Sequence, residues 1–311
     1  MAEVLISIKE IHRFYGDFEA LKGISLKVEK GQIFGYLGPN GSGKTTTIKL
    51  ILGLIKPSFG TVRVHGGDPY HDNDMNVRIN IGSMLELDGL YEKLTGLENV
   101  IFWAELFGIT GSKAVGQAKK VIKLVEMSEW AHVLVSKYSF GMRKRLALAR
   151  ALISDPDILI LDEPTVGVDP ETRYLIRKMM KDLASQGKTI FFSSHDLEEI
   201  QKTCTHVAII KKGKLISNGA LNDVLAQFGK PKLFIRLESA SDTETLGKKL
   251  EDIGYQIHIE GPLISFYPKN DLNIDDFSKY GILDSWKVES SLEEVYLNLV
   301  RDKRRKHEQP Y

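Results

Sequence analysis

The sequence predicts an α/β fold with a mostly parallel core sheet, a helical insert and a second, smaller α+β unit. Three observations lead to this prediction. After Pro156, apolar runs alternate with helical periods, which is typical of a parallel sheet with crossover helices. Between about Leu94 and Ile153 the helical period dominates. Beyond Pro231, short strands and helices follow one another in a stretch of their own.

The first part of the chain is predicted to form strands, with one helix before the last of them. Apolar and polar residues alternate in two stretches, and a short apolar run follows them. After Gly43 the apolar residues recur at helical spacing, until Gly53 and Pro57 end the pattern. The predicted elements are strands at 5–8, 24–28, 33–37 and 61–65, with the helix beginning at Gly43 between the last two.

The stretch after Pro156 alternates regularly between the two patterns. Short apolar runs indicate buried strands, and the longer amphipathic segments between them indicate crossover helices. The predicted strands lie at 158–161, 189–194 and 207–210, and the predicted helices at 171–185 and 197–203. The sheet that these strands form is expected to be parallel.

The last 80 or so residues predict a separate small domain, at 230–302. Its expected strands are 234–237, 255–259, 263–267 and 282–288, and its expected helices are 241–253, 275–280 and 291–300. Ser241 and Glu244 form a capping-box pattern at the first of these helices. The order β-α-β-β-α-β is that of a ferredoxin-like domain, here with an extra terminal helix. The charged segment 303–311 is expected to be disordered.

Composition excludes several classes of protein. The 311 residues carry a net charge of +1, so the basic excess typical of general nucleic-acid binders is missing. Cys204 is the single cysteine, which rules out an internal disulfide framework and fits a reducing compartment. The sequence contains neither the roughly 18 apolar residues of a transmembrane helix nor a signal peptide. We therefore expect a soluble, intracellular chain.

The strongest chemical signal is the phosphate loop, Gly38–Thr45, which reads GPNGSGKT and matches G-x-x-x-x-G-K-[ST]. It lies between an apolar strand and a helix, where backbone N–H groups and the helix dipole favour a bound phosphate. Lys44 is expected to reach the β- and γ-phosphates, and the Thr45 hydroxyl to bind Mg²⁺. The predicted nucleotide-binding residues here are Gly38, Pro39, Asn40, Gly41, Ser42, Gly43, Lys44, Thr45 and Thr46.

Two carboxylates follow a buried strand, as the second half of such a site requires. Asp162 comes directly after the apolar run 158–161 and is expected to hold Mg²⁺. Glu163, one residue further, is expected to accept a proton from the water that attacks the γ-phosphate. The alternative, a strand that ends in a helix-capping carboxylate, is much weaker because the phosphate loop is present in the same chain.

Together these motifs resemble the ATP-binding subunits of ABC transporters, and the resemblance runs from about Ser7 to Phe228. It implies a P-loop NTPase ABC cassette at 1–229, with a helical subdomain at about 88–155. It also implies that Tyr15 stacks on adenine and that Asp169 organises a dimer interface. His195, in the sequence SSHD, resembles the family's switch histidine, which contacts the γ-phosphate and orients the attacking water.

Two segments depart from the family's pattern. Where members commonly have Leu-Ser-Gly-Gly-Gln, this chain has YSFGM, here called the signature segment. The resemblance implies that this segment contacts the ATP held by the partner subunit. Its expected contacts are Ser139, Phe140, Gly141 and Met142. Phe140 replaces a residue that has no side chain, so its bulk is expected to slow hydrolysis or to mark the weaker half of an asymmetric pair. Glu86 falls where a metal-contacting Gln is common.

The resemblance also implies a function and its partners. Two subunits, in a homodimer or heterodimer, close head to tail on ATP and Mg²⁺ and drive a membrane permease made by a separate chain. The expected location is the cytoplasmic face of the cell membrane, with no nucleic acid bound. The segment Ser290–Tyr296 resembles the ending of exporter ATPases. Permease contacts are expected in the helical subdomain among Phe102, Trp103, Leu106 and Phe107, of which at least half are expected to serve core packing.

Two other functions remain open from the sequence. One is a non-transport ABC ATPase acting on DNA or ribosomes; the missing heptad repeats and the single phosphate loop argue against it. The other is a nucleotide-gated regulatory module with weak hydrolysis, which Phe140 and Met142 suggest and Glu163 opposes.

Overall fold

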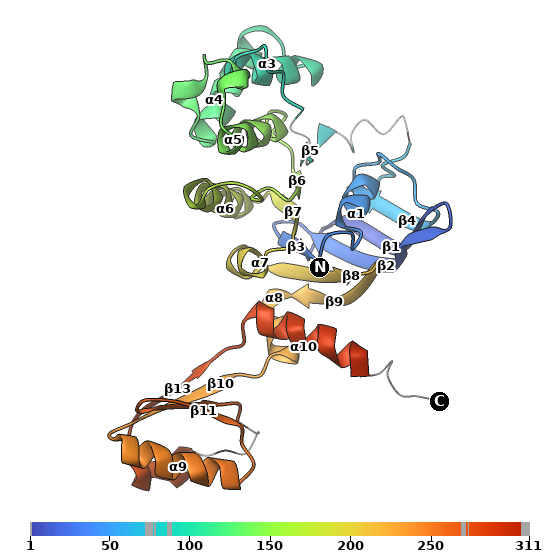
Figure 1. Ribbon diagram of the computed structural model, residues 1–311. Coiled ribbons are helices and arrows are strands. Elements are labelled where there is room, and N and C mark those ends of the chain that lie inside the picture. Colours follow the sequence, from blue (N-terminus) through green and yellow to red (C-terminus); the bar gives the residue numbers. More distant parts are fainter. Residues whose placement is uncertain are drawn as a thin grey trace. The chain divides into compact units, whose positions relative to one another are not determined.

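Two sheets with a helix between them form the first part of the chain in the computed structural model (Figure 1). The structure describes residues 2–71, 77, 79–85, 89–268, 272 and 274–305. The chain divides into two units, Met1–Leu221 and Asn222–Tyr311, and each is described here by itself.

The larger sheet of the first unit has the strand order β5-β6-β7-β3-β8-β9. Neighbouring strands are parallel, except that β9 runs antiparallel to β8. Strands β3, β6 and β7 are buried along their whole length, as expected of parallel strands with both faces covered. The predicted mostly parallel core sheet is confirmed. Its strands are β3 (Ile33–Leu37), β5 (Ile81–Met84), β6 (Ile158–Asp162), β7 (Thr189–Ser194), β8 (His206–Lys211) and β9 (Lys214–Ala220).

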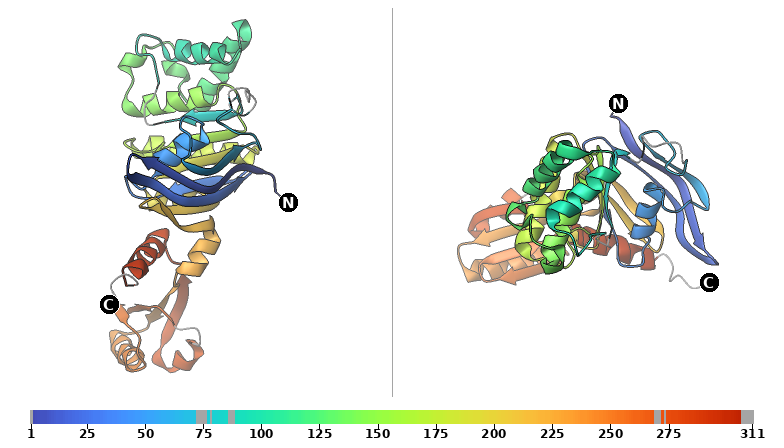
Figure 2. Two further views of the ribbon diagram at one scale, coloured as in Figure 1. Left: turned by 90° about the vertical axis from the view of Figure 1, so that its right-hand side faces the viewer. Right: turned by 90° about the horizontal axis from the view of Figure 1, so that it is seen from above.

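The smaller sheet is antiparallel, with the order β2-β1-β4, and it is the blue sheet in the left view of Figure 2. Its strands are β1 (Val4–Tyr15), β2 (Phe18–Glu29) and β4 (Phe59–Val64). Helix α1 (Lys44–Ile51) lies between the two sheets and buries Ile48 and Ile51 in their shared core. In that core the Phe34 and Phe191 rings stack 5.6 Å apart. The core thereby fixes the start of α1 against the ends of the parallel strands.

Two helices cover the other face of the parallel sheet (Figure 1). They are α6 (Pro170–Ser185) and α7 (Leu197–Thr203), and α8 (Leu221–Phe228) follows β9 in the chain. Helix α6 turns Ile176, Met179 and Leu183 inward at helical spacing. Both α6 and α7 begin at an aspartate cap that directly follows a loop of the candidate site. These caps hold the loops close to the ends of the strands.

The predicted helical insert is present between β5 and β6, where its helices group together in both views of Figure 2. Its elements are α3 (Gly96–Leu106), α4 (Gly111–Leu124), the 3₁₀ turns η1 (Ser128–Trp130) and η2 (Val135–Lys137), and α5 (Phe140–Ala151). Thr95 and Glu98 cap α3 reciprocally, as a capping box. Within the residues that the structure describes, no helix is long and apolar enough to cross a membrane.

The second unit contains an antiparallel sheet with the strand order β11-β12-β10-β13. One face of it packs against α9 around Leu233, Ile235 and Leu246. Its elements are β10 (Lys232–Leu237), α9 (Ala240–Asp252), β11 (Ile257–Glu260), β12 (Leu263–Phe266), η3 (Ile274–Tyr280), β13 (Ile282–Val288) and α10 (Leu292–Arg305). Helix α10 enters the segment 303–311 that the sequence predicts to be disordered; residues 306–311 lie outside the described ranges.

The predicted capping box of α9 is wrong. Ser239, and not Ser241, precedes the helix with extended backbone, and its hydroxyl accepts a hydrogen bond from the Asp242 N–H at 3.2 Å. Ser241 already lies in the first turn, where its carbonyl accepts a hydrogen bond from the Thr245 hydroxyl. Two serines two residues apart both satisfy the sequence rule, so only the backbone decides between them.

Candidate nucleotide-binding site

A cleft of about 410 Å³ lies where β1, the phosphate loop and the end of β6 meet. It brings together Tyr15, the phosphate loop and both predicted carboxylates. Its lining residues are Tyr15, Phe18, Ala20, Asn40, Gly41, Gly43, Lys44, Thr45, Thr46, Asp162 and Glu163. The sequence analysis did not identify Phe18 or Ala20. Phe18 pairs with Tyr15 across the β1–β2 hairpin, and this register places a second aromatic side chain at the cleft.

The backbone conformation and the close packing of the phosphate loop require glycine at Gly43 and at Gly38. Gly43 has φ +109°, a conformation that L side chains rarely adopt, and a Cβ there would lie 2.6 Å from Leu21 Cδ2. A Cβ at Gly38 would lie 2.3 Å from the Ile210 carbonyl oxygen. With Gly43 as its cap residue, α1 begins without a side-chain cap, so its first N–H groups remain available to a ligand.

An unsatisfied hydroxyl also lies in the phosphate loop. Ser42 is 2 % exposed, and its Oγ finds no hydrogen-bond partner among the residues that the structure describes. A buried polar group without a partner is costly, because it has lost its hydrogen bonds to water. Together with the free N–H groups of α1 and the helix dipole, this hydroxyl fits an anionic ligand with several oxygen acceptors.

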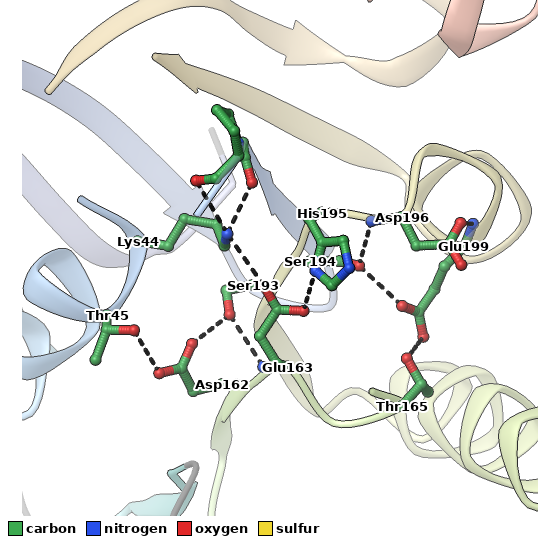
Figure 3. Close-up of polar contacts among 12 residues, drawn as sticks. Lys44, Thr45, Asp162, Glu163, Thr165, Ser193, Ser194, His195, Asp196 and Glu199 are labelled. Atoms are coloured by element: carbon green, nitrogen blue, oxygen red, sulfur yellow. Dashed lines mark hydrogen bonds and ion pairs between the residues drawn. The ribbon is translucent and has the colours of Figure 1, made fainter. Parts of the chain in front are cut away.

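Lys44 lies between the phosphate loop and the end of β6. Its Nζ donates to the Gly38 carbonyl at 2.7 Å and forms an ion pair with Glu163 Oε1 at 3.1 Å (Figure 3). The side chain is 6 % exposed, so this charge is largely shielded from water. A phosphate bound at the start of α1 would therefore meet a preorganised ammonium group.

Asp162 is held by two hydroxyl groups from different elements. Thr45 Oγ1 donates to Asp162 Oδ2 at 2.8 Å, and Ser193 Oγ donates to Asp162 Oδ1 at 2.5 Å (Figure 3). The β6–β7 register pairs Asp162 with Ser193 directly, which explains the second contact. The same Ser193 Oγ accepts the Glu163 N–H at 3.0 Å. One serine hydroxyl thus contacts both carboxylate residues, a role that the sequence analysis did not assign.

Glu163 has an unusual backbone conformation, with φ +47°. Such a conformation costs free energy for a residue other than glycine and persists only where the surroundings enforce it. Ser193 Oγ binds its N–H, and Lys144 Nζ donates to its carbonyl oxygen at 3.5 Å. The Glu163 side chain is 18 % exposed, and its Oε2 lies 3.0 Å from His195 Nδ1. The structure therefore brings two of the predicted catalytic side chains into direct contact.

The oxygen donors of the cleft fit a magnesium ion. Thr45 Oγ1 and the Asp162 carboxylate lie side by side at the predicted metal position. Across the described ranges, no three His, Cys, Asp or Glu side chains converge into a metal cage. Mg²⁺ does not need one, because it keeps several waters and binds through one or two carboxylates together with substrate phosphates. Glu86, the third predicted metal residue, lies outside the described residues.

The signature segment surrounds the start of α5 and does not line the cleft of its own chain. Ser139 caps α5, where its Oγ accepts the Met142 N–H at 3.2 Å. A Cβ at Gly141 would lie 3.3 Å from Asp169 Oδ2, so the segment touches the predicted dimer-interface loop. Asp169 caps α6 and accepts hydrogen bonds from the Thr172 N–H and hydroxyl, which lower the pKa of its carboxyl.

Phe140 packs against a loop of its own chain. A Cβ at Gly167 would lie 2.9 Å from Phe140 Cε1, so only glycine leaves room for the ring there. Lys144 Nζ lies 5.6 Å from the ring centroid, within the range of a cation–π contact. The Phe140 side chain is nevertheless 51 % exposed. Its ring therefore presents a large apolar surface next to Ser139.

Comparison with known protein families gives a consistent result. The family model for ABC transporters matches residues 21–166. The Nod factor export ATP-binding protein I of Cupriavidus metallidurans is 36% identical over 221 residues, which cover 71% of this chain and 73% of that protein. The bacitracin transport ATP-binding protein BcrA of Bacillus licheniformis is 35% identical over 300 residues, which cover 96% of this chain and 94% of that protein.

Solved structures share the fold of the first unit. The ATP-binding cassette MJ0796, a dimer in a post-hydrolysis state bound to ADP and Pi, has a TM-score of 0.65 and 28% identity, covering 70% of this chain and 99% of that one. CbiO1 from Clostridium perfringens, part of the ABC transporter complex cbiONQ, has a TM-score of 0.66 and 27% identity, covering 81% of this chain and 98% of that one.

Proposed function

This chain belongs to the family of ABC transporter ATP-binding subunits, ATPases that energise transport, and from that membership we propose that it powers an exporter whose permease is a separate chain. The observation that carries the catalytic part of the proposal is that Glu163 contacts both Lys44, which also bonds to the phosphate loop, and His195. The observation that supports export is the similarity to the Nod factor export ATP-binding protein I. The similarity to BcrA, a transport ATP-binding protein, extends over nearly the whole chain, second unit included.

In the proposed bound state, the triphosphate of ATP lies along the phosphate loop and the start of α1. Backbone N–H groups and the Ser42 hydroxyl bind phosphate oxygens, and Lys44 balances the charge of the β- and γ-phosphates. Tyr15 stacks on the adenine ring. One face of the Tyr15 ring already carries the Arg13 guanidinium at 4.7 Å, which leaves the other face for the base.

Hydrolysis in this proposal depends on Glu163 and His195. Glu163 accepts a proton from the attacking water, and its contact with Lys44 changes to make room for the γ-phosphate. His195 orients this carboxylate and contacts the γ-phosphate. Thr45 and Asp162 would hold Mg²⁺, with Glu86 as a further proposed contact, and the ion would neutralise charge on the β- and γ-phosphates.

We propose that two chains, identical or different, close head to tail so that each signature segment binds the partner's ATP. Ser139, Phe140, Gly141 and Met142 form this contact, and Asp169 lies at the interface. Ser139 and Phe140 are exposed at the start of α5 and do not line the cleft of their own chain, which supports the arrangement. So does the similarity to MJ0796, whose structure is described as dimeric.

We assign permease docking to the helical insert, which places the chain at the cytoplasmic face of the cell membrane. Leu106 is 62% exposed and Phe107 is 37% exposed at the end of α3, while Trp103 lies 5.0 Å under the Arg150 guanidinium. Leu106 and Phe107 are therefore the proposed contacts, and Phe102 and Trp103 are assigned to packing. That CbiO1 is described as part of a transporter complex supports a permease partner.

We propose a cassette at 1–229 that contains the helical subdomain at about 88–155. For the accessory domain that follows in the chain, at 230–302, we propose a ferredoxin-like topology. The sheet order β11-β12-β10-β13 supports it, because numbering the four strands along the chain gives 2-3-1-4, the ferredoxin-like order. The second crossover is the 3₁₀ segment η3 and not an α-helix.

Exporter function is tested in membranes. Cells that express this chain together with its permease should pump out a permease substrate, and inside-out vesicles from these cells should accumulate that substrate only with ATP. The Lys44→Ala variant should be inactive in both assays, whereas Leu106→Ala should lower transport and leave the ATPase of the purified chain unchanged. ATP-independent accumulation, or accumulation driven by Lys44→Ala, would contradict the proposal.

Phe140→Gly is expected to raise ATP turnover several-fold, about the factor of 5 to 30 that 1–2 kcal/mol represents. Removing the ring frees the approach of Ser139 and Gly141 to the partner's γ-phosphate. Steady-state ATPase assays at saturating Mg-ATP measure the change, and Tyr174→Ala, also exposed on the surface, serves as a control. Unchanged turnover would show that Phe140 is not inhibitory.

A further inference from the structure

A buried glutamate that the proposed mechanism does not use lies next to the loops of the site. Glu199 of α7 is 1% exposed, and its carboxylate accepts two hydroxyl groups. Thr165 Oγ1 donates to Oε1, and Ser194 Oγ donates to Oε2 at 2.9 Å (Figure 3). Both donors are themselves buried. Buried polar groups with all their partners in place form rigid networks, so this carboxylate fixes the two hydroxyls relative to each other.

The two hydroxyl groups belong to the two loops that carry the proposed catalytic pair. Thr165 lies two residues after Glu163, and Ser194 directly precedes His195. Glu163 Oε2 and His195 Nδ1, one from each loop, lie 3.0 Å apart. Glu199 therefore connects the two loops on one side, while the catalytic side chains meet on the other (Figure 3). A change in this connection shifts the two loops relative to each other.

Glu199 is itself held in place. Its N–H donates to Asp196 Oδ1 at 3.0 Å, and the Asp196 N–H donates to Ser194 Oγ at 3.0 Å. Arg173 Nη1 of α6 pairs with Asp196 Oδ2 at 3.2 Å. Burial raises the pKa of Glu199, and the hydrogen bonds from Thr165 and Ser194 oppose that rise because they favour the ionised form. The ionised carboxylate can accept one hydrogen bond at each of its oxygens, because neither oxygen carries a proton.

We propose that Glu199 is a positioning residue for ATP hydrolysis: it holds the loops of Glu163 and His195 so that these two side chains meet over the γ-phosphate. The proposal rests on the proposed function, since it takes Glu163 as the base and His195 as its partner. Glu199 touches neither substrate nor metal in it. A displacement of reacting groups by about 1 Å costs up to roughly 100-fold in rate, so a residue outside the cleft can control turnover.

The test is Glu199→Gln in the full chain, with Glu198→Gln as a matched control. Glutamine keeps the size of the side chain but offers one acceptor oxygen in place of two. Glu198 is the neighbouring residue on the same helix, exposed and paired with Lys202. We expect kcat to fall about 10- to 100-fold in Glu199→Gln, with KM and the Kd of Mg-ATP within about threefold of wild type. Glu198→Gln should match wild type.

A second set of variants keeps the test decisive where Glu199→Gln fails to fold. Thr165→Val removes one hydroxyl at nearly constant shape and should lower kcat, whereas Thr165→Ser keeps the hydroxyl and should restore it. A kcat within twofold of wild type in folded Glu199→Gln or Thr165→Val would overturn the proposal, as would a loss of ATP affinity as large as the loss of kcat. Glu163→Gln, measured in parallel, distinguishes a failure of the Glu199 proposal from a failure of the proposed function. Wild-type turnover in Glu163→Gln would refute the proposed function.

Discussion

Lys44→Ala is expected to abolish ATP turnover and to weaken ATP binding by at least about 100-fold. The Lys44 ammonium is nearly buried, and it is the cation that contacts both the phosphate loop and Glu163. Removing one partner of a buried ion pair costs roughly 3–5 kcal/mol, because the remaining charge stays in a poorly solvated place. In this variant the γ-phosphate and Glu163 would face each other without the ammonium group that lies between them.

The measurements are ATP binding by titration calorimetry and ATPase activity at saturating Mg-ATP. Lys49→Ala is the matched control, since Lys49 lies in the last turn of the same helix, outside the cleft. It should bind and hydrolyse ATP like wild type. Wild-type turnover in Lys44→Ala would mean that the ligand's phosphates do not lie along the phosphate loop.

Glu163→Gln is expected to lower turnover by about 100- to 10,000-fold, the range that a positioned general base contributes. Glutamine retains the shape and a hydrogen-bond acceptor toward His195, but it does not take up a proton from water. ATP binding should remain, since the phosphate loop, Thr45 and Asp162 are unchanged. Single-turnover hydrolysis of labelled ATP measures the chemical step directly, with Glu198→Gln as the control for a glutamate lost elsewhere. Hydrolysis at the wild-type rate would remove Glu163 as the base.

Much of the site could be predicted because its parts are local in sequence. The strand Ile33–Leu37, the phosphate loop and the helix after Gly43 form one continuous segment, and the predicted strand bounds match those observed. Asp162 ends the buried strand β6 and Glu163 follows it directly, so these two residues are also local to one segment. Apolar periodicity and glycine spacing report such segments well, because burial and backbone geometry constrain their residues directly.

The contacts between loops could not be predicted in this way. Ser193 and Glu199 act through register and packing, and serines at strand ends or glutamates on helices are too common to single out. Phe18 reaches the cleft only because the hairpin register pairs it with Tyr15. Strand β9 was missed because its residues are mostly half-buried and show no alternation, and the four-residue β5 is too short for a periodic signal.

The surroundings of Phe140 could be predicted from the sequence only in part. The sequence has a phenylalanine where family members commonly have a glycine, and in the structure half of that ring is exposed beside Ser139. The contact of the ring with Gly167 depends on a loop 27 residues away, and on the freedom of Gly167 at φ +77°. No local pattern links these two positions. Whether the ring slows hydrolysis therefore rests on the Phe140→Gly measurement.

In the proposed cycle, ATP closes two chains on each other and hydrolysis releases them. The most direct test is the mass of the Glu163→Gln variant by size-exclusion chromatography with light scattering, with and without Mg-ATP. We predict the mass of one chain without nucleotide and the mass of two chains with Mg-ATP, and the dimer should be lost again in Glu163→Gln combined with Ser139→Arg. A variant that binds ATP yet keeps the mass of a single chain would show that ATP does not close two chains on each other.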